Sequence, residues 1–276
     1  MPEYLRPHRL EEALGVLQRP FTVLAGGTDF YPSRVGRSIE EDVLDIGAIA
    51  DLRGIARGPA GWRLGATTTW GELIVADLPP LFDGLKQAAR EVGGRQIQNA
   101  GSIAGNLCNA SPAADGVPPL LVLGAEVEIA SLAGARRVPL ATFITGNRRT
   151  VLMPGELVVA IHVPAPEHEA RSAFLKLGAR RYLVISIVMA AATLEIAGDR
   201  IVSARVAVGA CSAVAQRLPA LEAALAGVAL DAGLGSKVAP GHLAPLAPID
   251  DVRGSAGYRS DVALTVLRRL LQGFAA

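Results

Sequence analysis

The stretch from residue 95 to residue 115 constrains the fold more than any other part of the chain. It reads RQIQNAGSIAGNLCNASPAAD, in which small and amide side chains crowd together and the apolar residues follow neither a helical nor a strand period. A segment with so few bulky side chains cannot be ordered by burying them. We therefore expect a loop that obtains its order from backbone contacts.

A second group of small residues follows a strand near the N-terminus. Leucines at helical spacing between residues 10 and 17 share one face, Pro20 ends that helix, and the apolar run 21–25 is typical of a strand. The strand runs directly into a turn at residues 26–29, which reads GGTD. Because two residues of this turn lack a Cβ, it permits positive φ and a close approach of the backbone to whatever lies above it.

Both stretches are candidates for holding a pyrophosphate group. A tight turn of glycine and small residues lets backbone N–H groups point at phosphate oxygens with no side chain in the way. The first candidate is residues 23–30 (VLAGGTDF) and the second is residues 102–106 (SIAGN). Neither follows the GxGxxG pattern that opens a helix in a Rossmann fold. Taken alone, each glycine motif is more often a structural turn, and Asp29 is equally interpreted as an Asx-turn residue.

Local signals predict the remaining elements. Thr69 followed by Glu72 has the spacing of a capping box, which indicates a helix near residues 71–76. Gly198 and Asp199 separate two apolar, β-prone runs and indicate a hairpin. We expect further strands at 43–46, 62–66, 125–130, 158–163, 184–196 and 201–208, and further helices at 81–92, 120–123, 219–226 and 261–271. The segment 164–169, which contains two prolines, predicts a domain boundary.

Composition and charge argue against several classes of protein. Among 276 residues, 27 Lys and Arg balance 26 Asp and Glu to a formal charge of +1, and no dense basic block indicates a nucleic-acid partner. No apolar run reaches the roughly 18 to 20 residues that span a bilayer, and the first residues lack the apolar core of a signal peptide, so we expect a cytoplasmic protein. The two cysteines and four histidines show no metal-binding spacing, so we expect no metal site. Cys108 is interpreted as a small buried residue.

In the order and context of these motifs the sequence resembles the FAD-binding medium subunits of the molybdenum hydroxylases. This family includes the flavin domain of xanthine dehydrogenase and the medium subunit of carbon monoxide dehydrogenase. The resemblance lies in AGGTD at 25–29 and in the block from Gln96 to Ser131, which contains GNL at 105–107 and NASPAAD at 109–115. It continues through GAEVE at 124–128, PGE at 154–156, SAFLK at 172–176 and the arginines at 180 and 181.

The family resemblance implies which residues bind the cofactor FAD. Residues 23–30 would form the first pyrophosphate-binding loop and residues 102–106 the second. Asp115 would anchor the ribose or ribityl hydroxyls, Lys176 would lie near the flavin ring, and Val158 would contact the ring. The complete set implied at the cofactor is Val23, Leu24, Ala25, Gly26, Gly27, Thr28, Asp29, Phe30, Ser102, Ile103, Ala104, Gly105, Asn106, Asp115, Val158 and Lys176. A carboxylate suits sugar hydroxyls, and a lysine suits the negative charge of a reduced flavin.

The resemblance also implies a fold and a function. The fold is α+β: an FAD-binding domain of the vanillyl-alcohol-oxidase/PCMH type at residues 1–168, with subdomains at about 1–56 and 57–168, followed by a smaller sheet-plus-helices domain at 171–276. The implied chain is an oxidoreductase, an FAD-binding electron-transfer subunit of a heterotrimeric molybdenum hydroxylase. Its partners would be an iron–sulfur small subunit and a molybdenum-cofactor large subunit. Electrons would pass from the iron–sulfur clusters through FAD to an external acceptor.

The sequence departs from the family at one position that bears on binding. The family usually has two adjacent glycines where this chain has Ala104 and Gly105, and alanine at a positive φ would cost about 1 kcal/mol. Ser102 replaces the commoner threonine but keeps its hydroxyl. Without the resemblance, Lys176 is equally a surface charge on a strand, and Tyr182 is more often a half-buried tyrosine than a flavin contact. The alternatives are a stand-alone flavin oxidase and a degenerate, non-catalytic scaffold.

Overall fold

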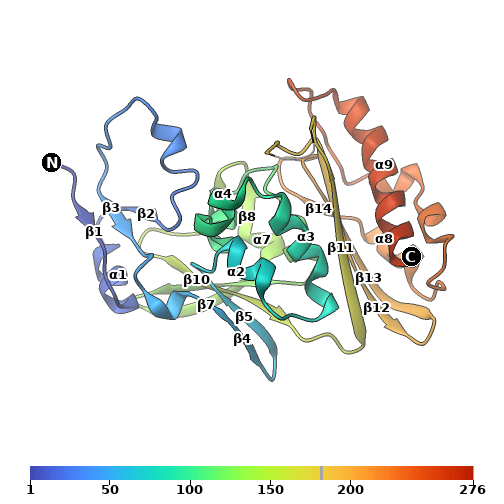
Figure 1. Ribbon diagram of the computed structural model, residues 1–276, viewed down its shortest axis with the longest axis horizontal. Coiled ribbons are helices and arrows are strands. Elements are labelled where there is room, and N and C mark those ends of the chain that lie inside the picture. The colour runs from blue at the N-terminus through green and yellow to red at the C-terminus, as the bar shows by residue number, and fades with distance from the viewer. Residues whose placement is uncertain (181–182, 276) are drawn as a thin grey trace.

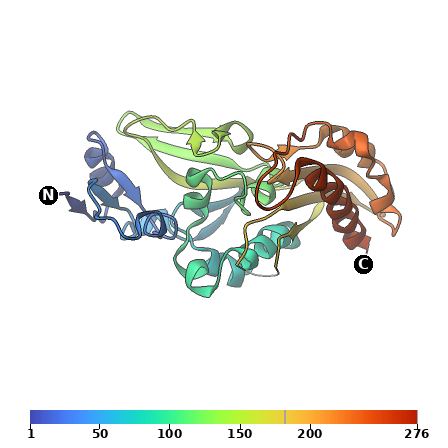
Figure 2. The same ribbon diagram turned by 90° about the horizontal axis from the view of Figure 1, so that it is seen from above.

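The computed structural model describes residues 1–180 and 183–275 of the chain, so Tyr182 and its interpretation lie outside the described residues. Three units, each made of a sheet and helices, follow one another along an elongated molecule, with the two termini at opposite ends (Figures 1 and 2). Each of the first two units is built on one sheet, and the third is a sheet with helices on its outer face. The mixed helix and sheet architecture confirms the α+β expectation. No helix among the described residues is long and apolar enough to cross a membrane.

The first unit is a small parallel sheet covered by one helix. Its strands lie in the order β1, β3, β2, and the helix α1 supplies Ala13 and Leu14 to a core shared with Leu44 of β3. The predicted helix and the two predicted strands are confirmed here, and β1 was not predicted. The bounds are β1 Tyr4–Leu5, α1 Leu10–Val16, β2 Thr22–Leu24, η1 Pro32–Arg34, β3 Val43–Asp45 and η2 Ala50–Leu52.

The second unit is an antiparallel sheet with its helices gathered against one face (Figure 2). The strand order is β4, β5, β10, β6, β7, and a small two-stranded ladder of β8 and β9 lies beside it. Trp62 of β5 packs edge-on against Phe82 with ring centroids 5.1 Å apart, which ties the sheet to the helical layer. The strands are β4 Ile55–Gly58, β5 Gly61–Gly65, β6 Glu126–Ser131, β7 Gly134–Pro139, β8 Ile144–Gly146, β9 Arg149–Thr150 and β10 Leu157–Pro164. The helices are α2 Trp70–Val75, η3 Pro80–Phe82, α3 Asp83–Glu91, α4 Arg95–Ala100, α5 Ile103–Asn109, α6 Val117–Val122 and α7 Leu140–Phe143.

Local signals in this unit were interpreted correctly at some positions and wrongly at one. The capping box is confirmed: the Thr69 hydroxyl accepts from the Glu72 N–H, and the Glu72 carboxylate accepts from the Thr69 N–H at 2.8 Å. The expectation that residues 95–115 form a loop is wrong, because α4 and α5 lie within them. Ile103 and Leu107, four residues apart and fully buried, form the apolar face of α5. A helix of two turns is too short to display an amphipathic period, so the pattern was not visible in the sequence.

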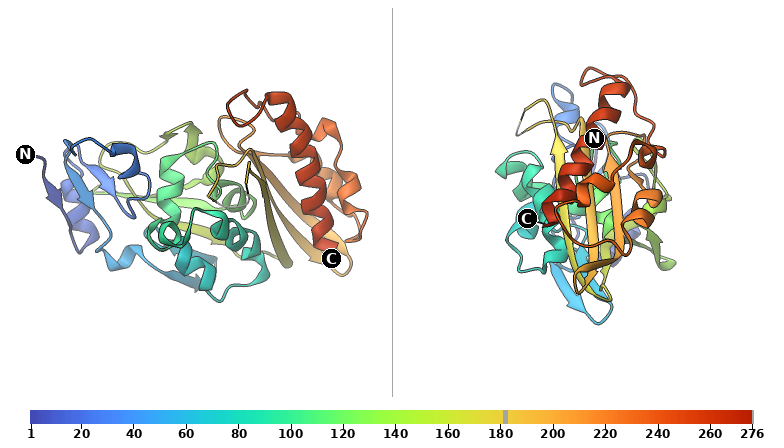
Figure 3. Two further views of the ribbon diagram at one scale, coloured as in Figure 1. Left: turned by 45° about the horizontal axis from the view of Figure 1, so that its top comes forward. Right: turned by 90° about the vertical axis from the view of Figure 1, so that its right-hand side faces the viewer.

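The third unit is an antiparallel sheet that is covered on both faces. Its inner face packs against α3 and α6 of the second unit, and its outer face packs against α8 and α9 (Figure 3). This double burial explains why β12 reads as a nearly continuous apolar run. The predicted hairpin is confirmed by the pairing of Ala197 with Arg200 around Gly198, which has a φ of +65°. The bounds are β11 Glu169–Leu177, β12 Val188–Ala197, β13 Arg200–Gly209, β14 Gln216–Arg217, α8 Pro219–Leu225, η4 Leu234–Lys237, η5 Pro240–Leu243, α9 Ala256–Gln272 and η6 Gly273–Ala275.

Candidate functional site

A cavity of about 430 Å³ lies where the first unit meets the helices of the second. This volume is within the range of small-molecule and cofactor sites, roughly 300 to 1,000 Å³. Its walls come from the first glycine loop, from α5 and the two residues before it, and from the start of β10. The lining residues are Thr22, Val23, Leu24, Ala25, Gly26, Gly27, Thr28, Asp29, Phe30, Arg34, Ile46, Ala66, Trp70, Val92, Gly101, Ser102, Ala104, Gly105, Asn106, Cys108, Asn109, Leu152, Glu156, Leu157 and Val158.

The first glycine loop meets the second region of small residues through its backbone. A Cβ added at Gly26 would lie 1.8 Å from the carbonyl oxygen of Ala100, so only glycine allows this contact. Gly27 has a φ of +69°, in the left-handed region that favours glycine. Within residues 1–180 and 183–275, the N–H groups of residues 25–30 donate to no protein acceptor. A cavity wall with unused N–H donors and little side-chain bulk suits the oxygens of a phosphate group.

The second region of small residues is the start of a helix, and its geometry shows the backbone conformation of Ala104. The Ser102 hydroxyl accepts from the Gly105 N–H at 3.1 Å and caps α5. Ala104 lies in the first turn of α5 and does not have a positive φ, so its methyl group carries no backbone strain. It lines the cavity beside Gly105. Alanine is acceptable where φ is not positive, and Ala104 meets this condition.

The structure gathers most, but not all, of the predicted residues around the cavity. The first loop from Val23 to Phe30, Ser102, Ala104, Gly105, Asn106 and Val158 all line it. Ile103 points into the hydrophobic core, where it is fully buried. Asp115 and Lys176 do not line the cavity formed by the described residues. Cys108, expected to be buried, is exposed and lines the cavity, so that interpretation is wrong.

Asp115 and Lys176 form a buried ion pair between the second and third units. The Lys176 ammonium lies 2.7 Å from the Asp115 carboxylate, and the two side chains are only 5% and 10% exposed. The Ser186 hydroxyl donates to the other oxygen of Asp115 at 2.6 Å. Burial raises the pKa of Asp115, against the opposing effects of the Lys176 ammonium and the Ser186 hydroxyl. Lys176 is thus not a surface charge.

The ion pair is one residue removed from the cavity wall on each side. Asp115 precedes Gly116, whose N–H donates to the side-chain oxygen of the cavity residue Asn106 at 3.3 Å. On the other side, the Lys176 ammonium lies 3.4 Å from the carbonyl oxygen of Glu91, the neighbour of the cavity residue Val92. A carboxylate accepts about four hydrogen bonds, and Asp115 has two donor partners among residues 1–180 and 183–275, so this part of the chain leaves it capacity for further donors.

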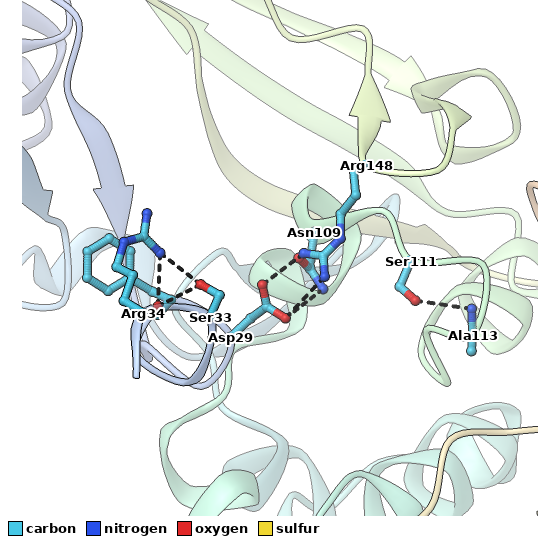
Figure 4. A network of polar contacts seen from close by, with 8 residues as sticks. Asp29, Ser33, Arg34, Asn109, Ser111, Ala113 and Arg148 are labelled. Atoms are coloured by element: carbon cyan, nitrogen blue, oxygen red, sulfur yellow. Dashed lines mark hydrogen bonds and ion pairs between the residues drawn. The ribbon is translucent and has the colours of Figure 1, made fainter. Parts of the chain in front are cut away.

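Several charged and polar residues of the site were not predicted (Figure 4). Arg34 of η1 lines the cavity, with its guanidinium carbon 3.7 Å from the centre of the Phe30 ring, and pairs with Glu41. Glu156 also lines the cavity, and its carboxylate accepts two hydrogen bonds from Arg136 at 2.7 and 2.8 Å. Glu156 and the cavity residue Asn109 lie inside the family motifs, so the sequence contained a signal that could have identified them as site residues.

Arg148 was also not predicted, although it reaches the rim of the cavity. Its guanidinium lies 2.8 Å from the carboxylate of Asp29. The sequence offers no local signal for this contact, since 119 residues separate the two partners. Arg148 could therefore be identified only from the tertiary structure.

The residues present fit a dinucleotide such as FAD. The unused N–H donors of the first loop suit the pyrophosphate, while Trp70, Leu157 and Val158 provide apolar surface for a ring system. The family model for the FAD binding domain in molybdopterin dehydrogenase matches residues 1–166, and the model for the CO dehydrogenase flavoprotein C-terminal domain matches residues 173–274. The chain belongs to this family of FAD-binding subunits. Its cofactor is FAD, and it is an oxidoreductase flavoprotein subunit of the molybdenum hydroxylase type.

Individual relatives share this organisation over nearly their whole length. The carbon monoxide dehydrogenase medium chain of Afipia carboxidovorans is 31% identical over 277 residues, which cover 98% of this chain and 95% of that one. The xanthine dehydrogenase FAD-binding subunit of Escherichia coli is 29% identical, covering 97% and 94%. Among solved structures, a reconstituted CO dehydrogenase from Oligotropha carboxidovorans has a TM-score of 0.89 at 30% identity, covering 100% of this chain and 99% of that chain.

Proposed function

We propose that this chain is the electron-transfer subunit of a heterotrimeric molybdenum hydroxylase. It would receive electrons from iron–sulfur clusters on a small partner subunit, which are supplied by a molybdenum-cofactor large subunit, and pass them through FAD to an external acceptor. A bound flavin supplies the chemistry, because it exchanges electrons singly or in pairs. The observation that carries the proposal is the cavity with its unused N–H donors, in a chain whose two family matches are both to flavoprotein domains.

We further propose that the phosphates of FAD bind between the two regions of small residues and that the flavin end lies toward Asp115 and Lys176. Asp115 would accept from ribose or ribityl hydroxyls with its remaining capacity, and the Lys176 ammonium would stabilise negative charge on a reduced flavin. Val158 would provide apolar contact. The position of the ion pair, one residue removed from the cavity residues Asn106 and Val92, supports this orientation.

The proposal is tested by reduction of FAD with and without partner subunits. The chain is purified alone and after co-expression with its genomic neighbours, and the flavin absorbance is followed after adding dithionite or candidate organic substrates. We expect dithionite to bleach the flavin in both preparations and an organic substrate to bleach it only in the complex. The complex prepared without this chain serves as the control for acceptor reduction.

Each alternative function predicts a different result in the same experiment. Bleaching of the isolated chain by an organic substrate would identify a stand-alone flavin oxidase. Absence of FAD from both preparations would favour the non-catalytic scaffold. The backbone at Ala104 removes the one residue-level reason for that scaffold, because the alanine is accommodated without strain.

A further inference from the structure

The side chains of Asp29, Asn109 and Arg148 form a polar cluster at the rim of the cavity (Figure 4). The Arg148 guanidinium donates to one carboxylate oxygen of Asp29 at 2.8 Å and also to the side-chain oxygen of Asn109. The Asn109 amide lies at 3.5 Å from the second carboxylate oxygen of Asp29. Asp29 and Asn109 both line the cavity. Arg148 therefore links the first glycine loop to the end of α5 from a third segment of the chain.

The backbone conformation around Arg148 holds this residue beside the end of α5. Arg148 lies in the turn between β8 and β9 with a φ of +57°, and its N–H donates to the carbonyl oxygen of Ala110 at 3.0 Å. Ala110, the C-cap of α5, has a φ of +48°. Both residues occupy the left-handed region that side chains with a Cβ rarely adopt. Two such residues joined by a hydrogen bond fix the turn against the end of α5.

The charge balance of the cavity gives this contact a consequence for binding. Among the described residues that line the cavity, the charged ones are Asp29, Arg34 and Glu156. Arg34 is paired with Glu41 and Glu156 with Arg136. Without Arg148, the carboxylate of Asp29 would stand uncompensated on the loop that holds a pyrophosphate. Like charges at close range repel, so an unpaired Asp29 would weaken binding of the dinucleotide.

We propose that Arg148 is a positioning residue for FAD, which acts by neutralising Asp29 and holding the first loop to the end of α5. It supports the cofactor through Asp29 rather than by touching it. The proposal rests on FAD binding at this cavity. It goes beyond the electron-transfer role, because it names a residue that raises the affinity of the apoprotein for FAD.

A double-mutant cycle on the apoprotein tests the proposal. FAD dissociation constants are measured by quenching of flavin fluorescence for the wild type, Arg148→Met, Asp29→Asn and the double variant. Arg149→Met is the matched control, because it removes the same charge one residue away and Arg149 forms no salt bridge within the described residues. The side chains of Arg148 and Asp29 are 56% and 52% exposed, so we expect Arg148→Met to raise the dissociation constant only about two- to fivefold and Arg149→Met to change it less than about twofold.

Comparing Arg148→Met in the wild-type and Asp29→Asn backgrounds separates a positioning role from direct contact of Arg148 with FAD. In the Asp29→Asn background, Arg148→Met should change the dissociation constant less than about twofold, and its effect in the wild-type background should shrink at high salt. An equal loss in both backgrounds would show a direct contact with the phosphates and would overturn the proposal. So would equal effects of Arg148→Met and Arg149→Met. Failure of the wild type to bind FAD would instead contradict the proposed function.

Discussion

Replacing Asp115 with asparagine should cost more stability than any surface change in the molecule. The substitution keeps the shape of the side chain but leaves the Lys176 ammonium, 5% exposed, without its counter-ion. Among the residues that the structure describes, the remaining acceptors of that ammonium are the carbonyl oxygens of Glu91 and Val184, both at 3.4 Å. These distances are too long for strong hydrogen bonds, so they replace little of the lost interaction.

The magnitude follows from the burial of the pair. Removing one partner of a buried ion pair leaves an uncompensated charge and costs about 3 to 5 kcal/mol. Lys176→Met should cost a similar amount, because it leaves the Asp115 carboxylate with the Ser186 hydroxyl as its one remaining donor in the described part of the chain. The double variant Asp115→Asn with Lys176→Met removes both charges and should lie within about 2 kcal/mol of the wild type, since replacing a whole buried pair is often nearly neutral.

The assay is urea unfolding of the apoprotein, followed by circular dichroism, for the four members of this cycle. The matched control is Glu169→Gln, which breaks the ion pair of Glu169 with Arg171, whose side chains are 65% and 50% exposed. An exposed pair contributes about 0 to 1 kcal/mol. If Asp115→Asn cost no more than this control, or if the double variant were as unstable as the sum of the single ones, the argument from a buried, coupled pair would be refuted.

Three further predictions concern the cavity walls. Gly26→Ala should lower FAD affinity at least tenfold in a fluorescence titration, because its Cβ would clash with the backbone of Ala100. Ala104→Gly should restore the usual family pattern yet lower the free energy of unfolding in urea by about 1 kcal/mol, since glycine weakens a helix, and an unchanged or higher free energy of unfolding would contradict this. The hydrogen bonds from Arg136 lower the pKa of Glu156 below its usual 4.5. The ionised Glu156 carboxylate therefore stabilises the fold above that pH, and this contribution is lost as the pH falls through the lowered pKa. The stability difference between wild type and Glu156→Gln should be largest at neutral pH and shrink as the pH falls below 4.5, and a difference that grew in acid would refute the assignment.

Elements with local chemical signals were predictable from the sequence. The first helix ends at Val16, ahead of Pro20, Thr69 and Glu72 form the predicted capping box, and Gly198 lies in the turn of the predicted hairpin. Each signal acts between residues that are neighbours in the chain, so it needs no knowledge of the rest of the fold. The first glycine loop was predictable for the same reason, because a strand followed by two glycines has a local geometry of its own.

The motif content of the sequence also determined the family and the cofactor. The block from residue 96 to residue 131 carried the resemblance, and the two family models cover residues 1–166 and 173–274. The same block was assigned the wrong local structure. Its helices α4 and α5 are short, and the burial of Ile103 and Leu107 depends on packing that only the folded chain provides.

Only the tertiary structure decided how the charges of the site are paired. Arg148 meets Asp29 across 119 residues of chain, and Lys176 meets Asp115 across 61. No periodicity or local motif records such contacts, because they arise where separate units pack together. The sequence by itself therefore determined the two regions of small residues that suit a dinucleotide. The fold determined which carboxylates near them are neutralised, since the free energy of a charge depends on its partners and its burial.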